Sequence, residues 1–125
     1  MSIAFARLGD RAPISLYSAG TFGFGGKRHQ GALLVSPEGI FDWRASGAGT
    51  DEAGLFGFLD RADGLLYDLL LLGTGPKPVL MAGDFRAEIE RRGLGLEAMD
   101  TAAAVRTYNI LLAENRYFVA ALLPV

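Results

Sequence analysis

The chain of 125 residues contains no cysteine and only one histidine, His29. Without cysteine it can form no disulfide bond, thiolate metal site or cysteine nucleophile. A single histidine excludes a zinc site made of several histidines and leaves one position for a Ser/His/Asp relay. We therefore expect no cofactor and no metal site, and any metal-dependent reaction would have to use carboxylates.

An excess of positive charge and long apolar runs are also lacking. The formal net charge is −2 and the isoelectric point is about 5.3, so we expect no broad electropositive face and no nucleic-acid partner. The strongly apolar stretches 64–72 and 117–123 are too short to cross a bilayer. The N-terminus has no extended apolar segment after a basic start, and Asp10 interrupts its arginines, which favours a cytoplasmic location.

The composition is that of a globular protein. Hydrophobic residues make up 50% of the chain and charged residues 21%, which is far from the range of disordered chains. A chain of this length buries roughly two-thirds of its unfolded surface around one core. We therefore expect a single domain over residues 1–125.

The first third of the chain has antiparallel character. Residues 1–11 mix apolar and charged residues without a period, which predicts a frayed arm. Residues 21–24 alternate with phenylalanine at every second position, which predicts a strand with both aromatic rings on one face. The β-prone runs 33–35 and 40–43 flank the sequence Ser-Pro-Glu-Gly, which is typical of a turn. These runs predict a β-hairpin.

The rest of the chain alternates helix and strand signals. Residues 65–72 form a nearly continuous aliphatic run, the pattern of a central strand covered on both faces. Apolar spacing and capping residues predict the helices. In chain order we expect a helix capped by Asp51, the strand 65–72, a helix over 79–92, a strand over 94–99, a helix capped by Asp100 or Thr101, and a strand over 117–123. This alternation favours an α/β fold with a largely parallel sheet, which the hairpin makes a mixed sheet.

The sequence 73–78, Gly-Thr-Gly-Pro-Lys-Pro, is the first candidate site. It leaves the carboxyl end of the expected central strand, where open α/β sheets commonly bind ligands. The N–H groups of Gly73, Thr74 and Gly75 could form an anion nest, with Lys77 adding charge. The prolines remove two donors, and the sequence is neither a Walker loop nor a dinucleotide fingerprint. The loop can be interpreted as a small-anion site or as a tight turn, and the tight turn is the favoured interpretation.

Glu97, Asp100 and Thr101 end the next expected strand and would approach the glycine loop in a doubly wound sheet. Paired carboxylates could exchange protons there if burial or repulsion shifted one pKa. Asp100 can instead cap the following helix while Glu97 faces Arg92 or Arg106. Capping is the favoured interpretation, and we assign no catalytic residue.

Arg106, Asn109 and Ile110 are the candidates for an interaction surface. Arg106 points away from the apolar stripe of its helix and Ile110 lies nearly opposite it, which indicates either a second packed surface or a docking face. Asn109 is expected to hydrogen-bond a neighbouring loop. Tyr108 is expected to be a core aromatic residue whose hydroxyl finds a partner.

Two other charged features have structural interpretations. The tripeptide 27–29, Lys-Arg-His, forms a basic tip beside two glycines and could touch an acidic partner, but a solvated loop is favoured. Asp68 lies within the aliphatic run 65–72. We expect it either to mark the entry of the strand or to meet an arginine or a backbone donor.

Three segments resemble the Mth-type domain family, long catalogued as a domain of unknown function. They are Leu-Leu-Leu-Gly-Thr-Gly at 70–75, Leu-Glu-Ala-Met-Asp-Thr-Ala-Ala-Ala-Val-Arg-Thr-Tyr-Asn at 96–109, and Ala-Ala-Leu-Leu-Pro at 120–124. With residues 20–24 and the hairpin, the likeness covers nearly the whole chain. The resemblance implies a three-layer α/β fold with a mixed central sheet, an N-terminal antiparallel hairpin and flanking helices.

The resemblance implies no established enzymatic activity. The best understood branch of the family includes a mitochondrial complex I assembly factor and helps to build a membrane-bound respiratory complex by binding other proteins. We therefore expect a non-enzymatic bacterial interaction or assembly accessory factor, whose partners belong to a membrane complex or its assembly factors, and which reaches the inner membrane only through them. The alternative is a small-anion or metabolite binder, or a weak enzyme, using the glycine loop with Glu97 or Asp100. Either kind of protein could also form a homodimer.

Overall fold

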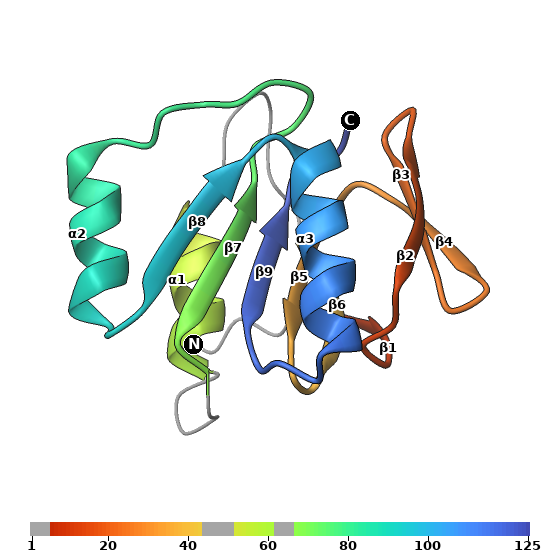
Figure 1. The fold of residues 1–125 in the computed structure, drawn as a ribbon, viewed down its shortest axis with the longest axis horizontal. Coiled ribbons are helices and arrows are strands. Elements are labelled where there is room, and N and C mark those ends of the chain that lie inside the picture. Colours follow the sequence, from red (N-terminus) through yellow and green to blue (C-terminus); the bar gives the residue numbers. More distant parts are fainter. Residues whose placement is uncertain (1–5, 44–51, 62–66) are drawn as a thin grey trace.

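The computed structural model describes residues 6–43, 52–61 and 67–125 (Figure 1). Its strands and helices follow one another in the chain as β1 (Arg7–Gly9), β2 (Ile14–Ser18), β3 (Thr21–Phe24), β4 (Lys27–Gln30), β5 (Ala32–Ser36), β6 (Gly39–Trp43), α1 (Glu52–Arg61), β7 (Leu69–Gly73), α2 (Gly83–Arg91), β8 (Gly95–Met99), α3 (Thr101–Ala113) and β9 (Val119–Leu122).

The central sheet has six strands in the order β1-β6-β5-β9-β7-β8. The strands β9, β7 and β8 run parallel, whereas β1, β6, β5 and β9 pair in antiparallel fashion. Parallel neighbours need crossover connections, which α2 and α3 supply. The predicted mixed sheet is confirmed, with its parallel part confined to the three strands β7, β8 and β9.

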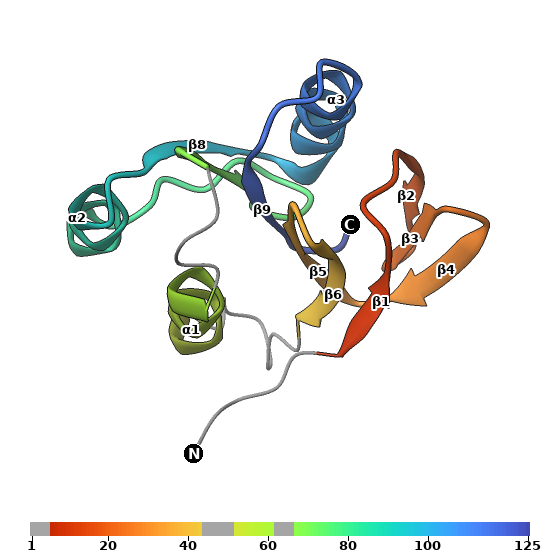
Figure 2. The ribbon, with the colours of Figure 1, turned by 90° about the horizontal axis from the view of Figure 1, so that it is seen from below.

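This sheet is the middle of three layers (Figure 2). The helix α3 and the small sheet β2-β3-β4 lie on one face, and α1 and α2 supply the core of the other. Side chains of β5 alternate between the two: Leu33 and Val35 join the α3 side, while Ala32 and Leu34 join the side of α1 and α2. The fold predicted from the family resemblance is confirmed.

The predicted hairpin forms as β5 and β6. Gly39 has a φ of +148°, and a Cβ atom there would lie 2.6 Å from the carbonyl oxygen of Gly9, so glycine lets β1 approach. The side chains of β6 divide between the two faces of the sheet. Ile40 belongs to the core on the α3 side, whereas Trp43 belongs to the core on the other side and Phe41 packs against that core.

Two predictions in the first third of the chain were wrong. Residues 7–9 were expected in a frayed arm but form β1, because their backbone pairs with β6 and the Arg7 guanidinium donates to the carbonyl oxygen of Glu38. Residues 27–29 were expected in a solvated loop but lie in β4. The turn before it has positive φ at Gly25 and Gly26, +56° and +75°, as a two-residue hairpin loop requires.

Several predicted boundaries shift inward. The helix predicted over 79–92 begins only at Gly83. Its buried side chains are Phe85 and Ile89, one turn apart, whereas Val79 and Leu80 before it are exposed. The aliphatic run 65–72 enters the sheet only at Leu69. Asp68 lies exposed just before it, which confirms the strand-entry interpretation. The predicted capping residue Asp51 lies outside the described residues.

Candidate functional site

The glycine loop at the carboxyl end of β7 packs directly against the start of α3. Gly73 is buried, and a Cβ atom there would lie 2.9 Å from Oγ1 of Thr101 and 3.2 Å from Cβ of Ala104. No larger residue fits between strand and helix without a shift of one of them. Glycine at this position therefore serves close packing.

Thr101 is fully buried and ties the loop to the end of β9. Its Oγ1 accepts a hydrogen bond from Gly75 N at 2.9 Å and donates to Leu123 O at 2.7 Å. Thr74 N donates to Met99 O at 2.8 Å. Two of the three N–H groups proposed for an anion nest are thus donated within the protein, which favours the tight turn over an anion site.

The charged residues near this loop lie at three different places. Asp100 caps α3, because its Oδ1 accepts from Ala103 N at 2.8 Å. Glu97 lies exposed on the edge strand β8, and Lys77 is exposed beyond the turn. The predicted cap is confirmed.

Arg92, predicted as one possible partner of Glu97, binds other carboxylates. Its guanidinium contacts Asp60 at 3.0 Å and Glu88 at 3.0 Å, and its Cζ lies 4.7 Å from the centre of the Phe56 ring. The hydrogen bond to Asp60 raises the pKa of Arg92. These contacts join α2 to α1, and the hollow beside them, lined by Leu59, Asp60, Tyr67 and Arg92, measures about 330 Å³.

The interaction candidates on α3 divide into two kinds. Arg106 and Ile110 are exposed, and 59% of Ile110 is open to solvent. Asn109 instead binds the backbone of Ile14 in β2: its Oδ1 accepts from Ile14 N and its Nδ2 donates to Ile14 O, both at 2.9 Å. The prediction that Asn109 meets a neighbouring loop is corrected to a strand, where it acts as a side-chain substitute for a strand partner.

Tyr108 is fully buried, as predicted, and its hydroxyl donates to Ala12 O at 2.8 Å. Its ring meets Phe118 edge-on, with the ring centres 5.5 Å apart. Burial raises the pKa of the Tyr108 phenol, because the phenolate would lose its hydration. The residue is a part of the core.

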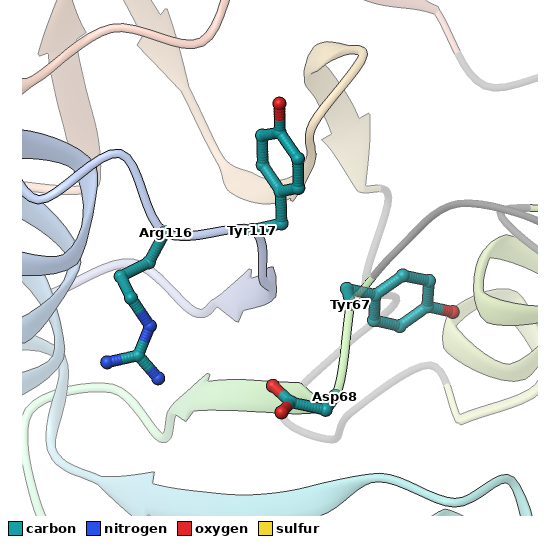
Figure 3. A pocket seen from close by; sticks show the side chains of 4 residues that line it. All are labelled: Tyr67, Asp68, Arg116 and Tyr117. Carbon is teal, nitrogen blue, oxygen red and sulfur yellow. The ribbon is translucent and has the colours of Figure 1, made fainter.

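A pocket that the sequence did not predict opens at the opposite, amino end of the parallel strands (Figure 3). It measures about 400 Å³ and is lined by Tyr67, Asp68, Arg116 and Tyr117. Leu70 of β7 pairs with Val119 of β9, so residues 67–68, which precede β7, come beside residues 116–117, which Phe118 separates from β9. A signal in the sequence was the repeated combination of tyrosine and a charged residue just before each of two buried strands.

The chemistry of this pocket is ionic and aromatic. Figure 3 shows the Asp68 carboxylate and the Arg116 guanidinium turned into the same space, while the rings of Tyr67 and Tyr117 point away from these two charges. Within residues 6–43, 52–61 and 67–125, no group of three histidine, aspartate or glutamate side chains is arranged to hold a metal ion. Across the same residues, no helix is long and apolar enough to span a membrane.

Comparison with known proteins gives the chain its relatives. The family described as a protein of unknown function (DUF498/DUF598) matches residues 14–123. An uncharacterised protein of Rhodobacter capsulatus is 38% identical over 90% of this chain and 84% of its own length. The NADH dehydrogenase (ubiquinone) 1 alpha subcomplex assembly factor 3 of Danio rerio is 31% identical over 86% of this chain, and that of Homo sapiens is 26% identical over 89%. The match spans 62% and 60% of those two proteins.

Solved structures share the fold. An outer membrane protein of Bartonella henselae superposes with a TM-score of 0.83 and 32% identity, covering 94% of this chain and 98% of that one. A Rhodopseudomonas palustris protein has a TM-score of 0.79 and 32% identity, covering 100% and 90%. A Mth938-like domain of Bordetella pertussis has a TM-score of 0.75 and 28% identity, covering 99% and 92%.

Proposed function

The chain belongs to the DUF498/DUF598 family of proteins of unknown function, which is the predicted Mth-type domain family, and on that premise we propose that it is a non-enzymatic accessory factor that binds other proteins during assembly of a larger complex. The observation that carries the proposal is its similarity, over nearly its whole length, to vertebrate proteins named as assembly factors. The proposal places its action in the cytoplasm, with any membrane contact made through a partner.

The outer face of α3 supports the proposal with a surface that the fold leaves open. Arg106 and Ile110 are four residues apart, so their side chains lie on the same side of the helix. The opposite side of α3 is buried in the core through Val105, Tyr108 and Leu111. An exposed aliphatic side chain beside an arginine provides both apolar area and directional hydrogen bonds, the combination that protein interfaces use.

The test is quantitative affinity capture from the native host with wild type and Ile110→Asp. A charge placed in an interface core costs several kcal/mol, so at least tenfold less of each specific partner should be recovered. Leu80→Asp is the matched control, because Leu80 is also an exposed aliphatic residue, 90% open to solvent, but lies in the connection between β7 and α2. It should retain the partners.

One outcome would contradict the proposed role, and another would contradict only its assignment to α3. If neither the wild type nor a cross-linked sample enriches any protein over a mock capture, the accessory role fails. If partners are retained by Ile110→Asp but lost by Leu80→Asp, the role stands while the assignment of α3 as the docking surface fails.

A further inference from the structure

The pocket at the amino ends of β7 and β9 is held open by its own backbone. Asp68 O accepts from Gly95 N at 2.8 Å, which fixes one wall to the start of β8. Arg116 N donates to Leu111 O at 3.0 Å, and Arg116 O accepts from Nη1 of Arg11 at 3.0 Å, which fixes the other wall below α3. The pocket therefore places its charged side chains on two anchored segments.

Its tyrosines are anchored as well. The hydroxyl of Tyr67 donates to Leu59 O at 3.1 Å, which ties that ring to α1. The ring of Tyr117 lies 5.9 Å from Cζ of Arg11, within the range of a cation–π contact. Anchored rings lose little side-chain entropy when a ligand binds, which makes them suitable walls for a small molecule.

The two charges in this pocket are left for a ligand. Among the described residues, neither the Asp68 carboxylate nor the Arg116 guanidinium forms an ion pair, although both side chains face the same space. A ligand with one charge would satisfy only one wall. A ligand that carries both an anionic and a cationic group satisfies both, and the net charge of the two walls, zero, gives no advantage to a simple anion or cation.

We propose that this pocket is a binding site for a small dipolar molecule of the free α-amino acid class, with the ligand carboxylate on Arg116 and its ammonium group on Asp68. The guanidinium matches a carboxylate in a two-pronged hydrogen-bonded pair. The tyrosine rings offer an apolar and aromatic surface to the ligand side chain. The volume of about 400 Å³ lies within the range of small-molecule sites and exceeds what one amino acid needs.

The test is an NMR titration of the ¹⁵N-labelled full chain with L-phenylalanine, which carries both charges and an aromatic side chain. N-acetyl-L-phenylalanine lacks the cationic group and L-phenylalaninamide lacks the carboxylate. Saturable shifts are expected at the amides of residues 67–68 and 116–117 with L-phenylalanine. Each blocked compound should bind at least tenfold more weakly, because it leaves one wall unpaired.

Variants separate the two walls. Arg116→Gln should weaken L-phenylalanine at least tenfold and leave L-phenylalaninamide within twofold, whereas Asp68→Asn should weaken L-phenylalanine equally and leave the N-acetyl compound within twofold. Arg28→Gln is the matched control, since it removes an exposed arginine from β4, and it should leave all three affinities unchanged. Equal binding of the three compounds, or absence of saturation by about 20 mM ligand, would overturn the site. This proposal does not depend on a protein partner, so its failure leaves the accessory role intact.

Discussion

The two ends of β7 and β9 are built from different chemistry. At the carboxyl end, the buried hydroxyl of Thr101 forms hydrogen bonds with the backbone of both Gly75 and Leu123, and no open space remains between the loop and α3 for a side chain at Gly73. At the amino end, two charged residues and two tyrosines surround a pocket of about 400 Å³. Open α/β sheets commonly bind ligands at the carboxyl ends of their strands. Here the start of α3 fills that place, and the free polar groups gather at the other end.

The difference arises from how the chain leaves each strand. The connection from β8 to α3 is immediate, since β8 ends at Met99 and α3 begins at Thr101. The start of the helix therefore packs closely against Gly73, and its first side chain, Thr101, accepts a hydrogen bond from the loop amide of Gly75. Near the amino ends of β7 and β9, residues 67–68 and 116–117 instead contribute two tyrosines and two charged side chains to a pocket. Stability and binding should accordingly respond to substitutions at opposite ends of the same strands.

The largest effect is expected from Thr101→Val at the closed end. Valine keeps the shape but removes the hydroxyl, so Gly75 N loses a buried acceptor and Leu123 O loses a partly buried donor. One buried and one partly buried group without partners should lower the free energy of unfolding by about 3 kcal/mol. Urea unfolding followed by circular dichroism measures this loss.

Thr101→Ser is the control for this prediction. It keeps the hydroxyl and removes one methyl group, so it should stay within about 1 kcal/mol of wild type. If valine and serine destabilise the protein equally, packing of the methyl group rather than the hydrogen bonds closes this end, and the contrast between the two ends loses its polar basis.

A smaller effect, dependent on pH, is expected from Tyr108→Phe. Tyr108 packs on Phe118, the residue between Tyr117 and β9, and its hydroxyl donates to Ala12 O. Loss of this bond should cost about 1 kcal/mol near pH 7. The pKa of Tyr108 is raised in the folded protein, because burial disfavours the phenolate. The unfolded chain therefore releases this proton from about pH 10, before the folded protein does, and the stability of the wild type falls above that pH.

Phenylalanine has no such proton, so the difference between the two proteins should shrink as the pH rises from about 9 to 11. Unfolding midpoints measured at a series of pH values test this. Tyr117→Phe, which removes an exposed hydroxyl at the rim, controls for the loss of a phenol at neutral pH. A gap between wild type and Tyr108→Phe that stays constant through this range would show that Tyr108 ionises alike in the folded and unfolded states, which contradicts its burial in the core.

The sequence predicts the closed end better than the open one. The cap at Asp100 and the buried face of α3 follow from local residue types and spacing, and the hairpin follows from its turn residues. All three were predicted correctly. The strand β4 was missed although Gly25 and Gly26 carry a hairpin-turn signal, because its basic residues resemble a surface loop. The two sheets separate through pairing choices that no local pattern specifies.

The candidate sites show the same limit. The glycine loop could be located from the sequence, but its engagement by Thr101 depends on how α3 packs on β7. The pocket depends on β9 lying beside β7, a neighbour relationship between segments separated by two helices and a strand. Asp68 and Arg116 acquire a common role only when this register is known, so composition and spacing could not bring them together.

The smallest effect is expected from removing charge at the open end. Asp68 and Arg116 are exposed, and their structural bonds are made by backbone atoms that substitution leaves in place. Asp68→Asn and Arg116→Gln should each change the free energy of unfolding by less than about 0.5 kcal/mol, the usual range for surface positions. Parallel urea titrations with Thr101→Val put both ends on one scale. A loss above about 1 kcal/mol would mean that the charges hold the fold together, because surface ion pairs are seldom worth more. The contrast is sharpest if the same two variants keep the wild-type free energy of unfolding but no longer bind the amino-acid ligand. The two charged side chains would then contribute to binding and not to folding.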